Sequence, residues 1–374
     1  MKNNIFKKDG FFSISSSILS VAIGLFVGFI LLLASNPSQA LEGAKTILLG
    51  GFNAGTMGIG QVLYGATPII LTGLSVGFAF KTGLFNIGAS GQMIVGAFVA
   101  VYVSLKWTFI PDSMVLIVAL IMSIIAGGLW ALIPGILKTY CNVSEVISTI
   151  MMNYIGMYTV NYLVSKTIFD SLRNQSITPP SYAVLPKWGL DKLFPGSSIN
   201  CGIFIAIAVV ILLYIILNKT TFGYELTACG FNKDASEYAG INSKKNIILS
   251  MVIAGAIAGL AGGVLFLSGT GKHIEVVDLL APEGLMGIPV ALLGASNPIG
   301  ILLSGLFISY INVGGFYLQA LNYPPQIIDI IISLIIYFTA FSSILKNVVK
   351  FIVTKISPRK HEMDKTTISD KGGE

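Results

Sequence analysis

Residues 81–105 read KTGLFNIGASGQMIVGAFVAVYVSL, a polar, glycine-rich segment that runs into an apolar stretch. Its part 86–105 has about the 20 residues that an α-helix needs to cross a bilayer. Asn86 and Gln92 carry amides that are costly to place in hydrocarbon unless they are hydrogen-bonded. Because the glycines between them permit an irregular backbone, the stretch predicts a break at membrane depth that is buried in protein or lines a cavity.

The 374-residue chain is too apolar for a water-soluble protein. Apolar residues make up 54% of it and charged residues 11%, and its mean hydropathy is +0.82. A soluble domain has about 25% charged residues, and a disordered chain has low hydrophobicity. These values exclude both classes and predict an all-α integral membrane protein.

Polar or proline-bearing loops divide the chain into about ten predicted transmembrane helices. The first is a retained span rather than a signal peptide, because its apolar run exceeds the roughly 7–15 residues of a signal core. Asn297-Pro298 splits one region, 284–314, which is either two short spans or one broken segment. The predicted spans are 14–34, 57–80, 86–105, 113–137, 145–165, 200–218, 246–268, 284–295, 298–314 and 326–346.

Basic residues set the expected orientation. With the N-terminus inside the cell, most of the 23 Lys and Arg residues fall in cytoplasmic segments. Cytoplasmic loops carry such an excess, so both termini are predicted inside. We expect a transmembrane domain, 1–346, and a cytoplasmic polar tail, 347–374. The basic residues then meet membrane lipid and do not form a nucleic-acid-binding face.

Polar residues inside the predicted spans are candidates for a substrate pathway. Glu145, Thr149 and Asn153 are spaced four residues apart and therefore share one helix face. This face either lines a cavity or has Glu145 solvated at the cytoplasmic end. The amides near residue 90 either form part of a pathway or join neighbouring helices. The candidate pathway residues are Asn86, Ser90, Gln92, Glu145, Thr149 and Asn153.

Asp329 is the only carboxylate well inside an apolar run. An isolated membrane aspartate suggests a proton relay or an ion-pair partner. Because Pro325 is close, solvation of Asp329 at the membrane interface is the alternative.

A cytoplasmic loop at 219–246 contains a predicted short amphipathic helix. Asp234 and Glu237 have the spacing of a capping box, Tyr238 lies on the apolar face, and Gly240 before Ile241 stops the helix. A helix this short needs a packing partner. The partner is the chain's own bundle, the bilayer surface, or a groove on another protein.

Enzyme motifs are incomplete. Gly269-Thr270-Gly271-Lys272 resembles the end of a phosphate-binding loop, but Phe266 stands where that loop needs its first glycine. The two histidines fall in opposite predicted compartments, so no metal site is expected. We predict a chain that is not an enzyme and has no ATPase site of its own.

Several short motifs occur in the order found in a known family. Together they resemble the permease subunits of bacterial nucleoside ABC importers, a family that also contains ribose-type and branched-chain amino-acid permeases. The motifs, most in one-letter code, are Ala66-Thr67-Pro68, GL (73–74), LFNIGASGQ (84–92), EVIST (145–149), MNY (152–154), TFGY (221–224), AGI (239–241), VALLG (290–294) and NP (297–298).

The resemblance implies a type II ABC-importer permease with ten spans in the bacterial plasma membrane. It implies that the 219–246 loop is the coupling helix, so that Asp234, Glu237, Tyr238, Gly240 and Ile241 dock on an ABC ATPase subunit. That partner would hydrolyse the ATP, and this chain would bind no cofactor. A second permease, usually a different chain, and an extracellular substrate-binding lipoprotein would complete the importer.

Three positions depart from the family pattern. The family usually has Glu where Ser90 stands, Arg near Thr227, and a basic or polar residue near Ala295.

The expected function is nucleoside import by alternating access, with ribose or another small solute as the alternative substrate. The alternative of another class is a proton-coupled secondary transporter that uses Asp329 or Glu145.

Overall fold

The computed structural model describes residues 2–341 and residue 347. Contacts divide the chain into two compact units, one formed by 1–44 with 323–374 and the other by 45–322. Apart from residue 347, the predicted tail lies outside the described residues, as do the last residues of the predicted span 326–346.

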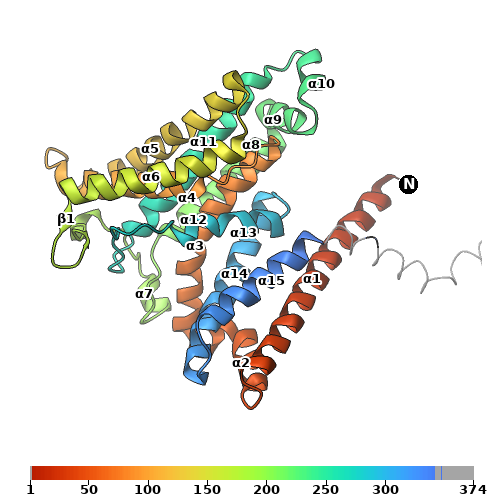
Figure 1. The fold of residues 1–374 in the computed structure, drawn as a ribbon, viewed down its shortest axis with the longest axis vertical. Helices are drawn as coiled ribbons and strands as arrows, with labels where there is room; N and C mark the ends of the chain where they lie inside the picture. The colour runs from red at the N-terminus through yellow and green to blue at the C-terminus, as the bar shows by residue number, and fades with distance from the viewer. Residues whose placement is uncertain (1, 342–346, 348–374) are drawn as a thin grey trace, which may run out of the picture. The chain divides into compact units, whose positions relative to one another are not determined.

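Nearly all of the regular structure is helical (Figure 1). The first unit contains α1 (Lys2–Ser35) and α15 (Gln326–Ala340), and α2 (Ala40–Leu49) continues from it into the second unit. The second unit contains η1 (Gly50–Ala54), α3 (Gly55–Lys81), α4 (Ala89–Lys106), α5 (Asp112–Cys141), α6 (Glu145–Thr167), β1 (Phe169–Asp170), β2 (Gln175–Ser176), η2 (Ser181–Ala183), α7 (Leu190–Leu193), α8 (Gly202–Lys219), α9 (Thr221–Phe231), α10 (Lys233–Tyr238), α11 (Ser243–Phe266), α12 (Pro282–Leu285), α13 (Gly287–Leu293), α14 (Pro298–Leu318) and η3 (Gln319–Leu321).

Small residues bring the two helices of the first unit together. Gly24 of α1 lies against Ile335 of α15, and Gly28 lies against Ile331, so the two helices run antiparallel. A Cβ atom on Gly24 would lie 2.6 Å from the Cα of Ile335, which leaves no room for a side chain. Such close approach through glycine is a common means of joining helices in lipid.

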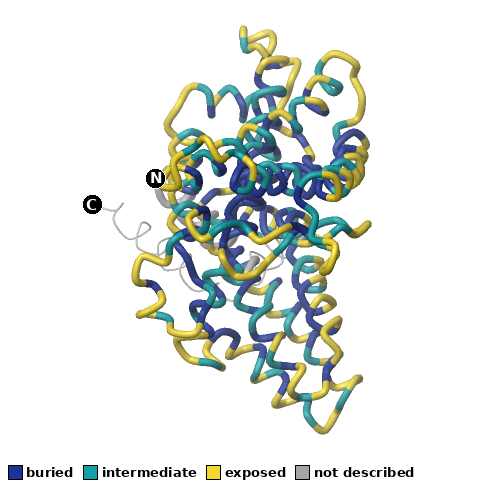
Figure 2. Tube along the Cα trace, turned by 90° about the vertical axis from the view of Figure 1, so that its left-hand side faces the viewer, coloured by how far each residue is buried: buried dark blue, intermediate teal, exposed yellow. Residues whose placement is uncertain are grey.

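The core of the second unit is built around α11, which packs on α3, α4 and α5. Gly259 lies at one of its tight contacts, because a Cβ there would be 2.2 Å from the carbonyl oxygen of Ser123. On the side of α4, a Cβ on Gly96 would be 2.4 Å from the Cα of Gly259. Figure 2 shows the buried residues concentrated in the interior of the fold. The helix α6 packs outside this core, on α4 and α5.

The structure contains the predicted break before α4. The helix α3 ends at Lys81, α4 begins at Ala89, and the residues between them form turns. The predicted span 86–105 therefore starts three residues too early.

The region 284–314 is one long helix preceded by two short ones. The helices α12 and α13 have 4 and 7 residues, far too few to cross a bilayer that needs about 20. Asn297 begins α14, because its side chain accepts a hydrogen bond from the N–H of Ile299 at 3.0 Å, and Pro298 occupies the first helical turn. The segment 284–295 is thus a broken piece rather than a straight span.

Seven helical stretches of the described chain are long and apolar enough to cross a membrane. They support an integral membrane protein with several spans. The helix α6 has 23 residues but does not belong to this set. The seven are Ile18–Ser35, Ala40–Lys81, Ala89–Lys106, Asp112–Cys141, Gly202–Lys219, Ser243–Phe266 and Pro298–Leu321.

The long loop 168–201 is ordered. The strands β1 and β2 form a hairpin, and Gln175 of β2 makes a further bridge to Glu275. The N–H of Leu185 donates to the carbonyl of Leu267 at 2.8 Å. This loop and the segment that follows α11 therefore form one folded cap at the same end of the second unit.

Candidate functional site

Asn86 and Gln92 bind each other through both atoms of each amide. The Nδ2 of Asn86 donates to Oε1 of Gln92 at 3.0 Å, and the Nε2 of Gln92 donates to Oδ1 of Asn86 at 3.1 Å. Both side chains are fully buried. The pair meets most of the hydrogen-bonding demand of two amides in a setting where water is scarce.

Asn153 of α6 joins this cluster from the neighbouring helix. Its Oδ1 accepts a hydrogen bond from the N–H of Gly91 at 2.8 Å, and its Nδ2 donates to the carbonyl of Ile87 at 2.9 Å. The Oδ1 of Asn86 also accepts from the N–H of Gly88 at 3.0 Å. These contacts fix the irregular backbone between α3 and α4 and hold α6 against it.

Thr149 and Ser90 are buried at the edge of the same cluster. The hydroxyl of Thr149 donates to the carbonyl of Glu145 in its own helix at 2.7 Å. The hydroxyl of Ser90 donates to the carbonyl of Ala281 at 3.0 Å, which ties the start of α4 to the segment before α12. A Cβ on Gly284 would lie 2.4 Å from the Cα of Ser90, so this contact is tight.

Glu145 lies apart from the amides and forms an ion pair. Its Oε2 is 2.7 Å from Nζ of Lys138, so the pair links the end of α5 to the start of α6. Both side chains are partly exposed. Asp329 is exposed in the first turn of α15. Among the residues whose burial the structure describes, no Asp or Glu is buried, so none has the setting of an internal proton carrier.

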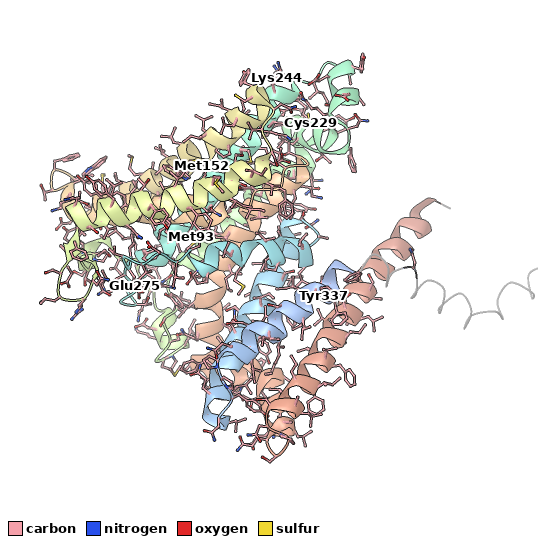
Figure 3. All side chains as sticks on the ribbon, viewed as in Figure 1. Met93, Met152, Cys229, Lys244, Glu275 and Tyr337 are labelled. Atoms are coloured by element: carbon pink, nitrogen blue, oxygen red, sulfur yellow. The ribbon has the colours of Figure 1, made fainter. Side chains whose placement is uncertain are left out.

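The opposite face of α6 is uncovered. Tyr154, Tyr158 and Tyr162 follow one another at four-residue spacing, and they are 45%, 56% and 63% exposed. Met152, labelled on α6 in Figure 3, is buried. The candidate residues predicted from the sequence lie only on the polar face of this helix and do not include the tyrosines, although their four-residue spacing is visible in the sequence.

The predicted short helix in the loop 219–246 exists, but its predicted cap is wrong. The helix is α10, Lys233–Tyr238, and its cap is Asn232, whose Oδ1 accepts from the N–H of Ala235 at 3.0 Å. Asp234 therefore lies within the first turn. Glu237 accepts a hydrogen bond from the hydroxyl of Ser243 at the start of α11 instead of reaching back to the cap.

The predicted apolar face of α10 points away from the chain. Tyr238 is 95% exposed, and the buried side chain is Ser236, whose hydroxyl lies 3.4 Å from the sulfur of Cys229 on α9. Gly240 has a φ of +83°, which suits its predicted role of ending the helix before Ile241. Cys229 and Lys244, labelled in Figure 3, mark the two helices that flank α10.

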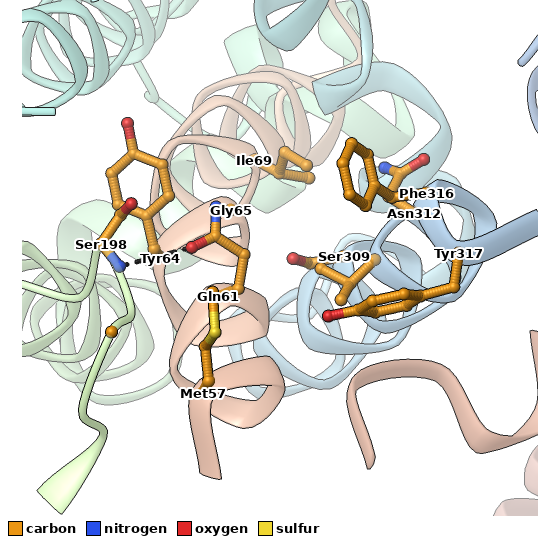
Figure 4. A pocket seen from close by; sticks show the side chains of 12 residues that line it. Met57, Gln61, Tyr64, Gly65, Ile69, Ser198, Ser309, Asn312, Phe316 and Tyr317 are labelled. Atoms are coloured by element: carbon orange, nitrogen blue, oxygen red, sulfur yellow. Dashed lines mark hydrogen bonds between the residues drawn. The ribbon is translucent and has the colours of Figure 1, made fainter. Parts of the chain in front are cut away.

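A cavity of about 490 Å³ lies between α3, α14 and the segment 196–198 (Figure 4). Gln61 and Tyr64 border it from α3, and Ser309 and Asn312 border it from α14. None of these was selected from the sequence. A signal was present, since Gln61 and Asn312 are amides within apolar helices, but nothing in the sequence shows that they face each other.

Comparison with known proteins identifies the family. The family model described as branched-chain amino acid transport system, permease component, matches residues 58–340. The chain is 37% identical to the guanosine ABC transporter permease protein NupP of Bacillus subtilis, over 91% of this chain and 96% of that protein. It is 34% identical to the nucleoside ABC transporter permease protein NupB of Lactococcus lactis, over 96% of both chains.

A sugar permease is also similar. The glucose ABC transporter permease protein TsgB13 of Haloferax volcanii is 30% identical, over 88% of this chain and 87% of that protein. The two nucleoside relatives come from bacteria that each have a second matching permease, NupQ and NupC. No solved structure matches the chain significantly. The chain belongs to the family of multi-pass permease components of ABC transport systems that this model describes.

Proposed function

We propose that the chain is the permease subunit of an ATP-driven importer of nucleosides. The observation that carries this proposal is similarity along more than nine tenths of the chain to two permeases whose names specify guanosine and nucleosides. The chain would contain about ten membrane crossings of the type II importer fold, with both termini in the cytoplasm. Glucose is the competing substrate class, because one relative with lower identity carries that name.

The helix α10 is the proposed contact with an ABC ATPase subunit. It presents Tyr238 to the outside, while Glu237 is hydrogen-bonded to Ser243 at the first residue of α11. The neighbouring α9 is tied to α11 as well, since Nδ2 of Asn246 donates to Oε2 of Glu225 at 3.1 Å. A movement of α10 would therefore pass directly into α11, the helix around which the core is packed. The ATP would bind and be hydrolysed in the partner, and this chain would supply alternating access.

The tyrosine face of α6, defined by Tyr154, Tyr158 and Tyr162, is the proposed contact with a second permease. Three phenol hydroxyls are poorly suited to the acyl-chain region, whereas they suit a seam between two proteins, where partner groups can hydrogen-bond to them. The buried polar residues on the other face of α6 would fix the position of this helix. They are Asn86, Ser90, Gln92, Thr149 and Asn153. Glu145 would contribute through its ion pair with Lys138.

The cap formed by the loop 168–201 and the segment after α11 is the proposed docking surface for a substrate-binding lipoprotein. It is ordered by backbone hydrogen bonds, and it exposes Leu172, Trp188 and Leu279. Ordered loops with exposed aromatic and aliphatic side chains are typical of protein interfaces.

Uptake of labelled nucleosides tests the proposal. Uptake of the label is compared between cells that carry the gene and cells that lack it, while the proton gradient is collapsed and ATP is maintained. Gene-dependent uptake that survives this treatment, and that unlabelled nucleosides but not glucose or ribose compete away, is the expected result. Uptake that disappears with the gradient would point to a secondary transporter. Competition by glucose or ribose would indicate a sugar as the substrate in place of nucleosides.

A further inference from the structure

The cavity between α3 and α14 has aromatic walls and an amide on each side. Tyr64 borders it from α3, whereas Phe316 and Tyr317 border it from α14 (Figure 4). Gln61 and Asn312 contribute the amides. Its volume of about 490 Å³ lies within the range of roughly 300–1,000 Å³ that is usual for small-molecule sites.

Both amides have unused hydrogen-bonding capacity. Gln61 uses its Oε1 to accept from the N–H of Ser198 at 3.3 Å, and within the described part of the chain its Nε2 has no acceptor. The amide of Asn312 makes no hydrogen bond to any described residue. By contrast, Ser309 in the same wall donates to the carbonyl of Val62 at 2.7 Å. The Nε2 of Gln61 and the amide of Asn312 are therefore available to a ligand or to water that enters the cavity.

The cavity suits an uncharged ligand. None of the described residues that line it is Asp, Glu, Lys, Arg or His. A smaller cavity of about 260 Å³ shares Tyr64 and Asn312 with it and contains Lys272, but Lys272 is paired with Glu283 there. A phosphate is usually held by a cation that is not already paired, and no described residue that borders the main cavity supplies one.

Aromatic rings and free amides together match the two faces of a nucleobase. A flat base stacks on aromatic side chains, and its edge forms paired hydrogen bonds with Asn or Gln. We infer that this cavity is a nucleoside-binding site within the permease, in which Gln61 and Asn312 recognise the edge of the base and the aromatic walls stack on it. This inference rests on the proposed function and adds the residues that select nucleosides over nucleotides and free sugars.

The hydroxyl of Tyr64 closes one end of the site. It lies 2.8 Å from Oγ1 of Thr270 and 3.3 Å from Oγ of Ser268, and these two hydroxyls are 2.9 Å apart. The ring of Tyr64 is therefore held in place by the segment after α11. Because the ring is already fixed, stacking it on a ligand costs less conformational entropy, which favours binding.

The first test measures guanosine uptake by the assembled importer in cells without other nucleoside uptake. Gln61→Ala and Asn312→Ala are each expected to raise the KM for guanosine about 3- to 10-fold, with little change in the maximal rate, because each removes one hydrogen bond to the ligand. Asn218→Ala is the matched control. Its amide is exposed at the end of α8 and donates only to the carbonyl of Tyr214 in the same helix.

The second test does not depend on transport. Asn312→Cys is introduced together with Cys141→Ser, because Cys141 is the exposed one of the three cysteines. The introduced thiol is labelled with a small polar maleimide. Guanosine and uridine are expected to slow the labelling, whereas ribose and guanosine monophosphate are not.

The possible results distinguish a failure of the proposed binding site from a failure of the proposed function. Unchanged KM in both alanine variants, with no protection of the thiol by guanosine, would overturn the site and leave nucleoside import intact. Equal protection by ribose would also overturn it, because the base would then play no part. Absence of gene-dependent nucleoside uptake by the unmodified importer would overturn the proposed function and the site together.

Discussion

Asn153 of α6 caps the start of α4, a different helix, by accepting a hydrogen bond from the N–H of Gly91 at 2.8 Å. The first N–H groups of a helix have no partner within it, and a side chain at the preceding residue usually supplies one. Here that preceding residue is Gly88, which has no side chain. The cap therefore comes from 62 residues further along the chain, and the break before α4 depends on α6.

Asn153→Ala is expected to destabilise the permease. It leaves the buried N–H of Gly91 and the partly buried carbonyl of Ile87 without this partner. An unsatisfied buried group costs about 1–3 kcal/mol. The unfolding temperature of the purified protein should fall by about 4 °C or more. Asn218→Ala, which removes an exposed amide, should leave it unchanged. Equal unfolding temperatures for the two variants would contradict the capping role.

Gly259→Ala is expected to prevent normal packing of α11. The new methyl group would meet the carbonyl oxygen of Ser123 at 2.2 Å, so the helices must separate. Gly135→Ala is the control, since the nearest atom there is a side-chain atom of Met251 at 3.3 Å and alanine favours a helix by up to about 1 kcal/mol. Membrane yield and the unfolding temperature should fall sharply for the first variant only. A normal yield of Gly259→Ala would show that the contact with α5 is not this close.

The helices could be predicted from the sequence because each apolar run is about as long as a bilayer is thick. The predicted spans 113–137 and 145–165 lie within α5 and α6. The cap of α10 is harder to predict from the sequence. Asn232 and Asp234 are both good capping residues, and only the residue at which the helix begins decides between them. Gly240, where a positive φ excludes most other residues, was a firmer signal.

The site could be predicted only in part. The amides Asn86, Gln92 and Asn153 were selected because polar groups in spans need partners, and the structure brings all three together. The sequence could not reveal that their partners are each other and the nearby backbone. For the same reason it pointed to the polar face of α6, where Thr149 and Asn153 are buried, and not to its tyrosines. Gln61 and Asn312 come to border the same cavity only through tertiary packing.

Tyr238→Asp is expected to abolish transport and leave membrane insertion intact. The side chain is 95% exposed, so the substitution should not disturb the permease itself. An unpaired charge buried in a protein interface carries a desolvation cost of several kcal/mol, and the ATPase should no longer co-purify. Tyr238→Phe keeps the ring and should retain both transport and co-purification. Normal transport by Tyr238→Asp would remove α10 as the docking element.

Glu145→Gln is expected to leave transport within about twofold of the unmodified importer. The carboxylate is engaged by Lys138 in a partly exposed pair, and such pairs contribute about 0–1 kcal/mol. Uptake is measured with ATP maintained, with and without a proton gradient. Complete loss of uptake in this variant, with normal membrane insertion, would favour a proton carrier at this position and revive the secondary-transporter alternative.

Tyr158→Cys is expected to cross-link to the second permease. Tyr158 is 56% exposed at the middle of the tyrosine face, so a cysteine there, labelled with a photoreactive maleimide in a Cys141→Ser background, should lie within cross-linking reach of the partner. Ile211→Cys is the matched control. Ile211 is 54% exposed on α8, an apolar helix whose outer side should face lipid, and it should not cross-link. The test uses the complete importer in native membranes and detects the product by its mass. Cross-linking from α8 but not from α6 would place the partner on the wrong face for the proposed seam.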